Sequence, residues 1–158
     1  LPVPPSPNLR SDLAISLYPS LCLLEATDVT VGRGTERPFE QFGHPNFPDS
    51  LAYEFTPTPN LGAKKPKHNG VLCHGVLLND TGYYRMSQLD LSFLFDAHHF
   101  MKGDLFRGRK KRMFYLLCGT DEIEVQMEKG MSEEEIRATW KSDLEEFMEI
   151  REKYLLYP

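Results

Sequence analysis

Residues 26–50, ATDVTVGRGTERPFEQFGHPNFPDS, decide the fold class of this chain. They are rich in glycine, proline and polar residues, so we expect one long ordered loop. A loop of this length inside a compact domain is uncommon and usually serves a function. The apolar run before it, residues 13–25 (LAISLYPSLCLLE), is interrupted by Pro19. We predict a short helix or turn there, followed by a buried strand that ends at Glu25.

Two further strands are expected after this loop. Residues 51–56 (LAYEFT) alternate between apolar and polar side chains, and residues 70–78 (GVLCHGVLL) form another apolar run. Ten of the twelve prolines precede residue 60. Because proline fixes φ and lacks an amide donor, the first third of the chain should be rich in loops with short strands.

Helices are expected in the C-terminal half. Ser87 is a candidate cap for a helix that runs to about Phe100. Residues 109–118 form either another helix or a strand, and residues 122–129 are expected to form a short helix. Gly130 suits the end of the last of these. The order of the elements predicts an α+β fold, with short strands and long glycine- and proline-rich loops first and helices later.

The last predicted helix, residues 132–153, has the clearest pattern. Ser132 and Glu135 have the spacing of a capping box. Apolar side chains then recur at helical spacing, and we expect this stripe to pack on the core; its members are Ile136, Trp140, Leu144, Phe147 and Tyr154.

Length and composition limit the possible functions. A chain of 158 residues suits one domain, residues 1–158. Its net charge of −5 argues against nucleic acid as a partner, and the basic run at residues 107–112 (RGRKKR) is interpreted as a solvated face. No apolar stretch approaches the roughly 20 residues that a membrane span requires.

Metal and nucleophile motifs are absent from the sequence. The five histidines have neither HxxxH nor HExxH spacing, and no GxSxG, P-loop or dinucleotide motif occurs. The three cysteines lack CxxC spacing, although a disulfide between Cys22 and Cys73 stays open. We therefore expect neither a metal nor a cofactor.

Candidate site residues cluster after the predicted strand. Glu25 precedes a glycine-flanked arginine, Arg33, and the guanidinium of an arginine matches a carboxylate or phosphate. Gly34 lets the backbone approach a ligand, Thr35 adds a hydroxyl group, and Arg37 adds a second cation. These residues suit an anionic sugar. The alternative is that Glu25 pairs with one of the arginines and only braces the loop.

Two other segments leave a choice open. Residues 62–67 (GAKKPK) either place cations at the rim of a cleft or form a solvated lysine turn. Phe39, Phe42 and Phe47 either pack within the chain or form an apolar patch on which another domain docks. We expect the docking patch.

Several stretches resemble one family, the bacterial exo-β-N-acetylmuramidases of the NamZ type, formerly a domain of unknown function. The resemblance is carried by residues 3–9 (VPPSPNL), 18–45 (YPSLCLLEATDVTVGRGTERPFEQFGHP), 62–66 (GAKKP), 70–76 (GVLCHGV), 130–140 (GMSEEEIRATW) and 151–158 (REKYLLYP). Ala26 stands where the family usually has glycine. The stretch at 18–45 is the most specific of these.

The resemblance implies that the chain is the C-terminal domain of a two-domain enzyme. A preceding Rossmann-like domain would form the other wall of the substrate cleft. Such an enzyme removes N-acetylmuramic acid from the non-reducing ends of peptidoglycan fragments, in the cell envelope, periplasmic or secreted. On this view Glu25 is the candidate catalytic residue, and Arg33, Gly34, Thr35 and Arg37 bind the sugar. The alternative is a non-catalytic peptidoglycan-binding or packing module.

Overall fold

The computed structural model describes residues 3–79, 88–106 and 111–157. The chain divides into two compact units: the first unit is Leu1–Asp121 and the second unit is Glu122–Pro158. Whether residues 1–158 act as one domain of a larger enzyme stays a prediction.

The first unit opens with helix α1, Asp12–Leu21, which leads directly into a 3-10 helix, η1, Cys22–Ala26. Ser11 caps α1, since its hydroxyl oxygen accepts a hydrogen bond of 3.0 Å from the amide of Ala14. The strand predicted to end at Glu25 is therefore wrong, because this part of the chain is helical throughout.

Leucine spacing explains why α1 continues through Pro19. Leu13, Leu17 and Leu21 recur every fourth residue, and all three are buried. An internal proline costs a helix about 3 kcal/mol. Burying one leucine contributes about 1.5–3 kcal/mol, so three leucines on one face outweigh that cost.

The sheet has three antiparallel strands in the order β1-β3-β2. Strands β2, Tyr53–Phe55, and β3, Cys73–Leu77, confirm the two predicted strands. Strand β1, Gln41–His44, lies inside the segment predicted to be only a loop. Gly43 is unfavourable in a strand and only Phe42 is a strong strand former, so pairing with β3 sets the conformation of β1.

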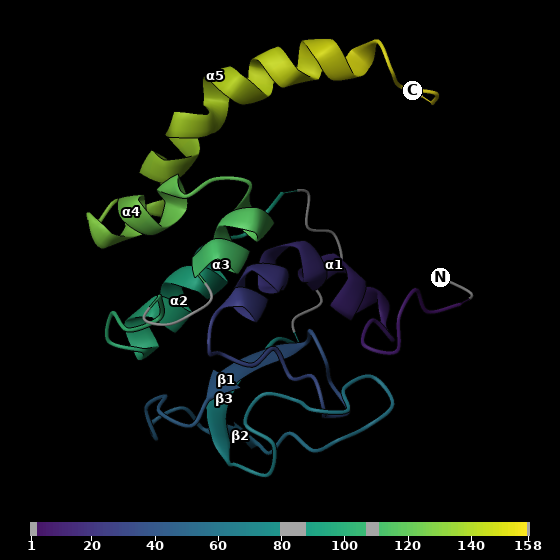
Figure 1. Ribbon diagram of the computed structural model, residues 1–158, viewed down its shortest axis with the longest axis vertical. Helices are drawn as coiled ribbons and strands as arrows, with labels where there is room; N and C mark the ends of the chain where they lie inside the picture. The colour runs from purple at the N-terminus through teal and green to yellow at the C-terminus, as the bar shows by residue number, and fades with distance from the viewer. Residues whose placement is uncertain (1–2, 80–87, 107–110, 158) are drawn as a thin grey trace. The chain divides into compact units, whose positions relative to one another are not determined.

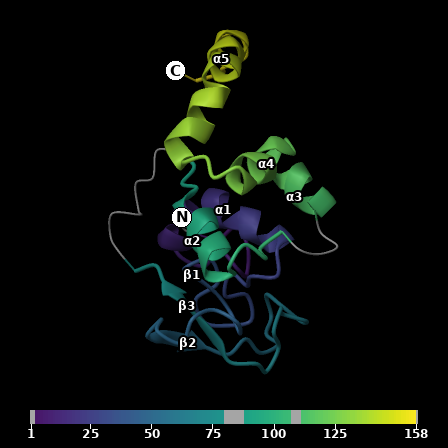
Figure 2. The ribbon, with the colours of Figure 1, turned by 90° about the vertical axis from the view of Figure 1, so that its left-hand side faces the viewer.

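Aromatic packing joins the sheet to helix α2, Ser92–Phe100. The ring of Phe42 lies 6.3 Å from Phe47 and 6.1 Å from Phe93, centroid to centroid. Phe47 in turn lies 5.2 Å from Phe100. Figures 1 and 2 show α1 and α2 on the same side of the sheet.

The three phenylalanines expected in a docking patch belong to this core instead. Phe39, Phe42 and Phe47 are exposed by only 2%, 0% and 2%, and Phe39 packs edge-on against Tyr18. The predicted docking patch is therefore wrong, because these rings fill the space beneath the helices.

Helix α2 begins at Ser92, with Leu91 at the N-cap position. Leu91 and Leu94 are buried, whereas Ser87, the expected cap, lies outside the described residues. Helix α3, Lys111–Cys118, confirms the helical alternative for residues 109–118. Most of the basic run, residues 107–110, also lies outside the described residues.

The second unit contains α4, Glu122–Glu128, and α5, Glu133–Glu152. The predicted capping box is confirmed: the hydroxyl of Ser132 accepts from the amide of Glu135 at 3.2 Å, and the Glu135 carboxylate accepts from the amide of Ser132 at 2.8 Å. Arg137 adds an ion pair with Glu133, one turn earlier.

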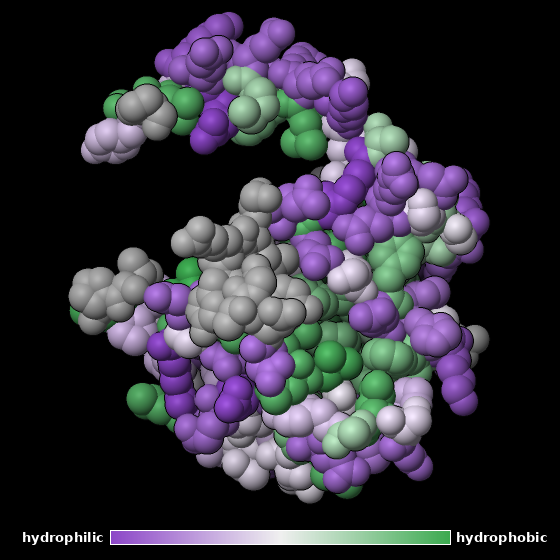
Figure 3. Space-filling model, turned by 180° about the vertical axis from the view of Figure 1, so that it is seen from behind, coloured by the Kyte–Doolittle hydropathy of each residue, from purple (hydrophilic) through white to green (hydrophobic). Residues whose placement is uncertain are grey.

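The predicted burial of the α5 stripe is confirmed for Ile136 and wrong for Leu144, Phe147 and Tyr154, whereas Trp140 is half-buried. Ile136 is buried, but Leu144, Phe147 and Tyr154 are 53%, 56% and 77% exposed. Figure 3 shows green apolar side chains among purple charged ones along this helix, at the top of the view. Capping and ion pairs along the helix supply local stability that burial does not.

The α+β fold class is confirmed, with the strands in the first half of the chain. The first half also contains α1 and η1, although the sequence predicted a strand over part of this stretch. Across the described ranges, no helix has the length and apolar character of a membrane span.

Candidate functional site

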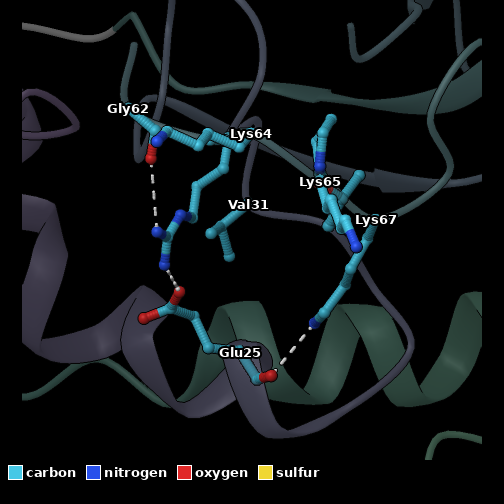
Figure 4. A pocket seen from close by; sticks show the side chains of 10 residues that line it. Glu25, Val31, Gly62, Lys64, Lys65 and Lys67 are labelled. Carbon is cyan, nitrogen blue, oxygen red and sulfur yellow. Dashed lines mark hydrogen bonds and ion pairs between the residues drawn. The ribbon is translucent and has the colours of Figure 1, made fainter. Parts of the chain in front are cut away.

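A cleft of about 410 Å³ opens in the first unit between η1, the segment that follows it, and the loop between β2 and β3. Figure 4 shows Glu25 below Val31, with Gly62 and Lys64 above it and Lys67 to one side. The lining of the cleft consists of Glu25, Thr30, Val31, Arg33, Gly62, Ala63, Lys64, Lys65, Pro66 and Lys67.

Glu25 reaches this cleft from η1. Its Oε1 accepts a hydrogen bond of 2.7 Å from Nη1 of Arg33, which forms an ion pair whose side chains are 25% and 42% exposed. Nη2 of Arg33 also donates to the carbonyl of Gly62, at 3.4 Å. The arginine therefore links the carboxylate to the opposite wall of the cleft. At this exposure the ion pair itself adds at most about 1 kcal/mol of stability.

Lys67 fixes the backbone around Glu25. Its ammonium group donates to four carbonyl oxygens at 2.7–3.2 Å, those of Leu24, Glu25, Thr27 and Val29. The last carbonyls of a helix lack partners within the helix, and a cation near them is favourable. Lys67 therefore holds the end of η1 and the start of the following segment in one conformation.

The loop that carries the lysines is itself rigid; we call residues 60–67 the lysine rim. The side-chain oxygen of Asn60 accepts from the amides of Gly62 and Ala63, at 3.0 and 2.9 Å. Asn8 donates to the carbonyl of Gly62 at 2.8 Å. A Cβ atom at position 62 would lie 2.5 Å from Oδ1 of Asn8, so a side chain there would displace Asn8.

Gly34 lets the lysine rim pack against the segment after η1. Its φ is +87°, and a Cβ atom there would lie 2.7 Å from both Thr58 O and Pro66 Cβ. Its carbonyl accepts from the amide of Thr58 at 2.8 Å. The glycine thus permits close contact between two stretches of this chain, and it is not part of the cleft lining.

Thr35 and Arg37 lie outside the cleft lining as well. The hydroxyl of Thr35 donates to Gly32 O at 2.7 Å and accepts from the side-chain amide of Gln41 at 2.7 Å. Arg37 lies 3.8 Å from the carboxylate of Glu40. The structure therefore brings Glu25 and Arg33 together at the cleft and places the other two in contacts that support the segment.

The cleft is cationic although the whole chain is acidic. Its lining contains four cations, Arg33, Lys64, Lys65 and Lys67, and one carboxylate, Glu25, in a chain of net charge −5. That carboxylate is already paired with Arg33. A small anion would therefore enter a cleft with excess positive charge.

Two histidines, His68 and His44, lie close to the backbone of the segment that follows η1. Nε2 of His68 is 2.7 Å from the carbonyl of Asp28, and its ring lies 4.6 Å from that of His44. Burial, followed by the proximity of His68, lowers the pKa of His44 to about 4. His44 is therefore neutral at pH 7, and its Nδ1 accepts from the amide of Asn46 at 3.0 Å.

The cysteines lie apart from the cleft lining, and all three are free, so no disulfide joins Cys22 to Cys73. Burial raises the pKa of Cys73 to about 11 and that of Cys118 to about 12. Their thiols are therefore protonated at neutral pH. Within residues 3–79, 88–106 and 111–157, no group of three or more histidine, cysteine or acidic side chains is placed to hold a metal ion.

Sequence reasoning predicted Glu25 and Arg33 as site residues but missed that Lys67 fixes the backbone around Glu25. No motif marks a lysine that bonds to backbone carbonyls about 40 residues away. For residues 62–67 it left open a cleft rim or a solvated lysine turn; the structure places them along the cleft, with Lys64 and Lys65 exposed to solvent.

The family model for the C-terminal domain of the exo-β-N-acetylmuramidase NamZ matches residues 16–157. The chain belongs to this family. It is 32% identical over 171 aligned residues to the peptidoglycan β-N-acetylmuramidase NamZ of Bacillus subtilis (strain 168), covering 97% of this chain and 40% of that protein. The chain thus spans about 40% of the length of this curated relative.

Two crystal structures of DUF1343 family proteins from Bacteroides fragilis NCTC 9343 share the fold. One is 45% identical, with a TM-score of 0.88 over 99% of this chain and 44% of that chain. The other is 20% identical, with a TM-score of 0.68 over 99% of this chain and 45% of that chain, and shows the fold alone. Both matched chains are more than twice as long as the region that this chain covers.

Proposed function

We propose that this chain is the C-terminal, substrate-cleft domain of an exo-β-N-acetylmuramidase. The whole enzyme would release N-acetylmuramic acid from the non-reducing ends of peptidoglycan fragments, during turnover of the cell wall. The observation that carries this proposal is the cationic cleft at Glu25 and Arg33 in a chain of the NamZ family. N-acetylmuramic acid bears a lactyl carboxylate, which suits such a cleft.

Glu25 is the acidic residue that we propose for the chemistry. Glycoside hydrolysis usually requires two carboxyl groups that flank the scissile bond. The cleft lining of this chain provides one, Glu25. The second would come from a preceding Rossmann-like domain, which would form the opposite wall. We place the enzyme in the cell envelope, periplasmic or secreted, because that is where peptidoglycan occurs.

Arg33 is our candidate for direct contact with the sugar. Nearly half of its side chain is exposed at the cleft, and the ion pair with Glu25 fixes its direction. Gly34 and Thr35 support the segment from which Arg33 projects. The substrate contact predicted for Gly34, Thr35 and Arg37 stays a prediction.

A second candidate function follows from the same ion pair. Because Arg33 already holds the Glu25 carboxylate at 2.7 Å, the pair also suits a brace in a non-catalytic peptidoglycan-binding or packing module. In that module the cleft would bind a sugar, and all carboxyl groups that act in catalysis would lie elsewhere. The two candidates differ in whether loss of the Glu25 charge abolishes turnover.

The proposal is tested by incubating the full-length protein with peptidoglycan oligosaccharides and identifying the products by mass spectrometry. We expect free N-acetylmuramic acid, released one residue at a time from non-reducing ends. Oligosaccharides that end in N-acetylglucosamine serve as the control and should stay intact. Internal cleavage, or release of the same monosaccharide from the control, would contradict the proposal.

A further inference from the structure

The cations of the cleft fall into two groups. Arg33 is bonded to Glu25 and to the carbonyl of Gly62. The ammonium of Lys67 is bonded to four backbone carbonyls. Both side chains thus already serve the structure of the cleft.

Lys64 and Lys65 form the second group. Both line the cleft, and both are exposed to solvent. Of the ion pairs that the structure gives for the described residues, none involves either lysine. Their positive charges are therefore available to a ligand.

The backbone beneath these two lysines is held in place from both ends. Asn60 binds the amides of Gly62 and Ala63 before them, and Pro66 after them packs closely on Gly34. A rigid backbone lowers the entropy lost when the two side chains bind a ligand.

We propose that Lys64 and Lys65 bind the carboxylate of the sugar substrate and select anionic sugars over neutral sugars of the same shape. This inference rests on the proposed function and deepens it. The lactyl carboxylate projects from the sugar ring on a rotatable ether. A lysine ammonium binds as a point charge with rotatable donors, so it tolerates the range of directions that such a group adopts.

Arg33 and Glu25 complement this role. The ion pair neutralises the only carboxylate of the cleft lining, which removes the group that would repel an incoming anion. The sugar carboxylate then meets the two lysines at the rim, and the ring lies toward Glu25. Selection for charge thus comes from the rim, and the chemistry from the base of the cleft.

The test compares two chromogenic substrates of the full-length enzyme, a β-N-acetylmuramide and the methyl ester of its lactyl group. The ester removes the charge and keeps the shape. We expect wild type to prefer the acid about tenfold in kcat/KM, which corresponds to two exposed charge contacts. Raising the salt concentration should reduce this preference.

The double variant Lys64→Gln, Lys65→Gln should lose the preference by lowering kcat/KM for the acid, with the ester changed less than about twofold. The double variant Lys64→Arg, Lys65→Arg should retain it. Lys129→Gln, an exposed lysine of the second unit, is the matched control and should change neither rate.

Two outcomes overturn the inference and are distinguishable. If the double glutamine variant keeps the preference for the acid, the lysines do not select the charge, while the proposed function stands. If wild type hydrolyses neither substrate, the proposed function fails and the inference with it.

A circular dichroism spectrum of each variant checks that its fold is intact. If the double glutamine variant does not fold, the single Lys64→Gln and Lys65→Gln variants replace it.

Discussion

Residues 26–44 and helix α5 are both conspicuous in the sequence, yet they are ordered by opposite means. The segment at 26–44 has little regular secondary structure, but most of its residues are buried. Helix α5 is regular over 20 residues and has one buried residue, Ile136. Regular secondary structure and burial are therefore separate properties in this chain.

The difference lies in the source of the stabilising contacts. In the segment they come from distant residues, since Lys67 donates to the carbonyl of Thr27 and the amide of Thr58 donates to the carbonyl of Gly34. In α5 they come from neighbours within one turn, through the capping box and the pair of Arg137 with Glu133. A substitution should therefore cost more in the segment than beside the helix.

The largest effect is expected from Gly34→Ala. The added Cβ would lie 2.7 Å from Thr58 O and Pro66 Cβ, at a φ of +87°. We expect the free energy of unfolding to fall by about 4 kcal/mol, of which about 1 kcal/mol reflects the left-handed conformation and the rest overpacking. Urea unfolding measures the change.

Gly130→Ala is the matched control for this prediction, on the α5 side of the comparison. Gly130 has a φ of +77° and open space within 4 Å of the added atom. Only the conformational cost remains there, about 1 kcal/mol. Equal losses in the two variants would contradict the claim that tertiary contacts order the segment.

A second, smaller effect is expected from acid. The unfolded chain binds a proton at His44 near pH 6.5, whereas burial lowers the pKa of the folded His44 to about 4. Between these values the unfolded state binds more protons, so the free energy of unfolding falls as the pH drops from about 7 to 4, by about 3 kcal/mol in total. Urea unfolding between pH 4.5 and 7.5 follows this loss.

His44→Asn keeps an acceptor for the amide of Asn46 and does not titrate, so this part of the pH dependence should vanish in the variant. An unchanged slope in His44→Asn would show that other groups cause the acid sensitivity. In α5 the hydrogen bonds from Ser132 lower the pKa of Glu135 below its usual range, so that cap is lost only in stronger acid. Acid should therefore weaken the segment before the cap of the helix.

Local signals in the sequence predicted the elements whose patterns lie within a few neighbouring residues. The capping box at Ser132 and Glu135, the short strands at 51–56 and 70–78, and the helix end at Gly130 all appear where the pattern indicated. The pattern of each spans only a few positions, although β2 and β3 are stabilised by pairing between distant strands.

Elements that depend on distant partners were not predictable in this way. Pro19 indicated a break in α1, but burial of its leucines maintains the helix. Strand β1 exists because β3 pairs with it. For the site, the proximity of Glu25 and Arg33 was readable from their short separation, whereas the reach of Lys67 to the η1 carbonyls was not.

The most direct test of the central claim is kcat for release of N-acetylmuramic acid by the full-length enzyme carrying Glu25→Gln. Glutamine can still accept the hydrogen bond from Arg33, so the segment should stay folded. Glu36→Gln, a side chain that is 92% exposed, is the control. We expect kcat to fall about a thousandfold in Glu25→Gln alone. Turnover near that of wild type would contradict a catalytic role and leave Glu25 as a brace in a binding module.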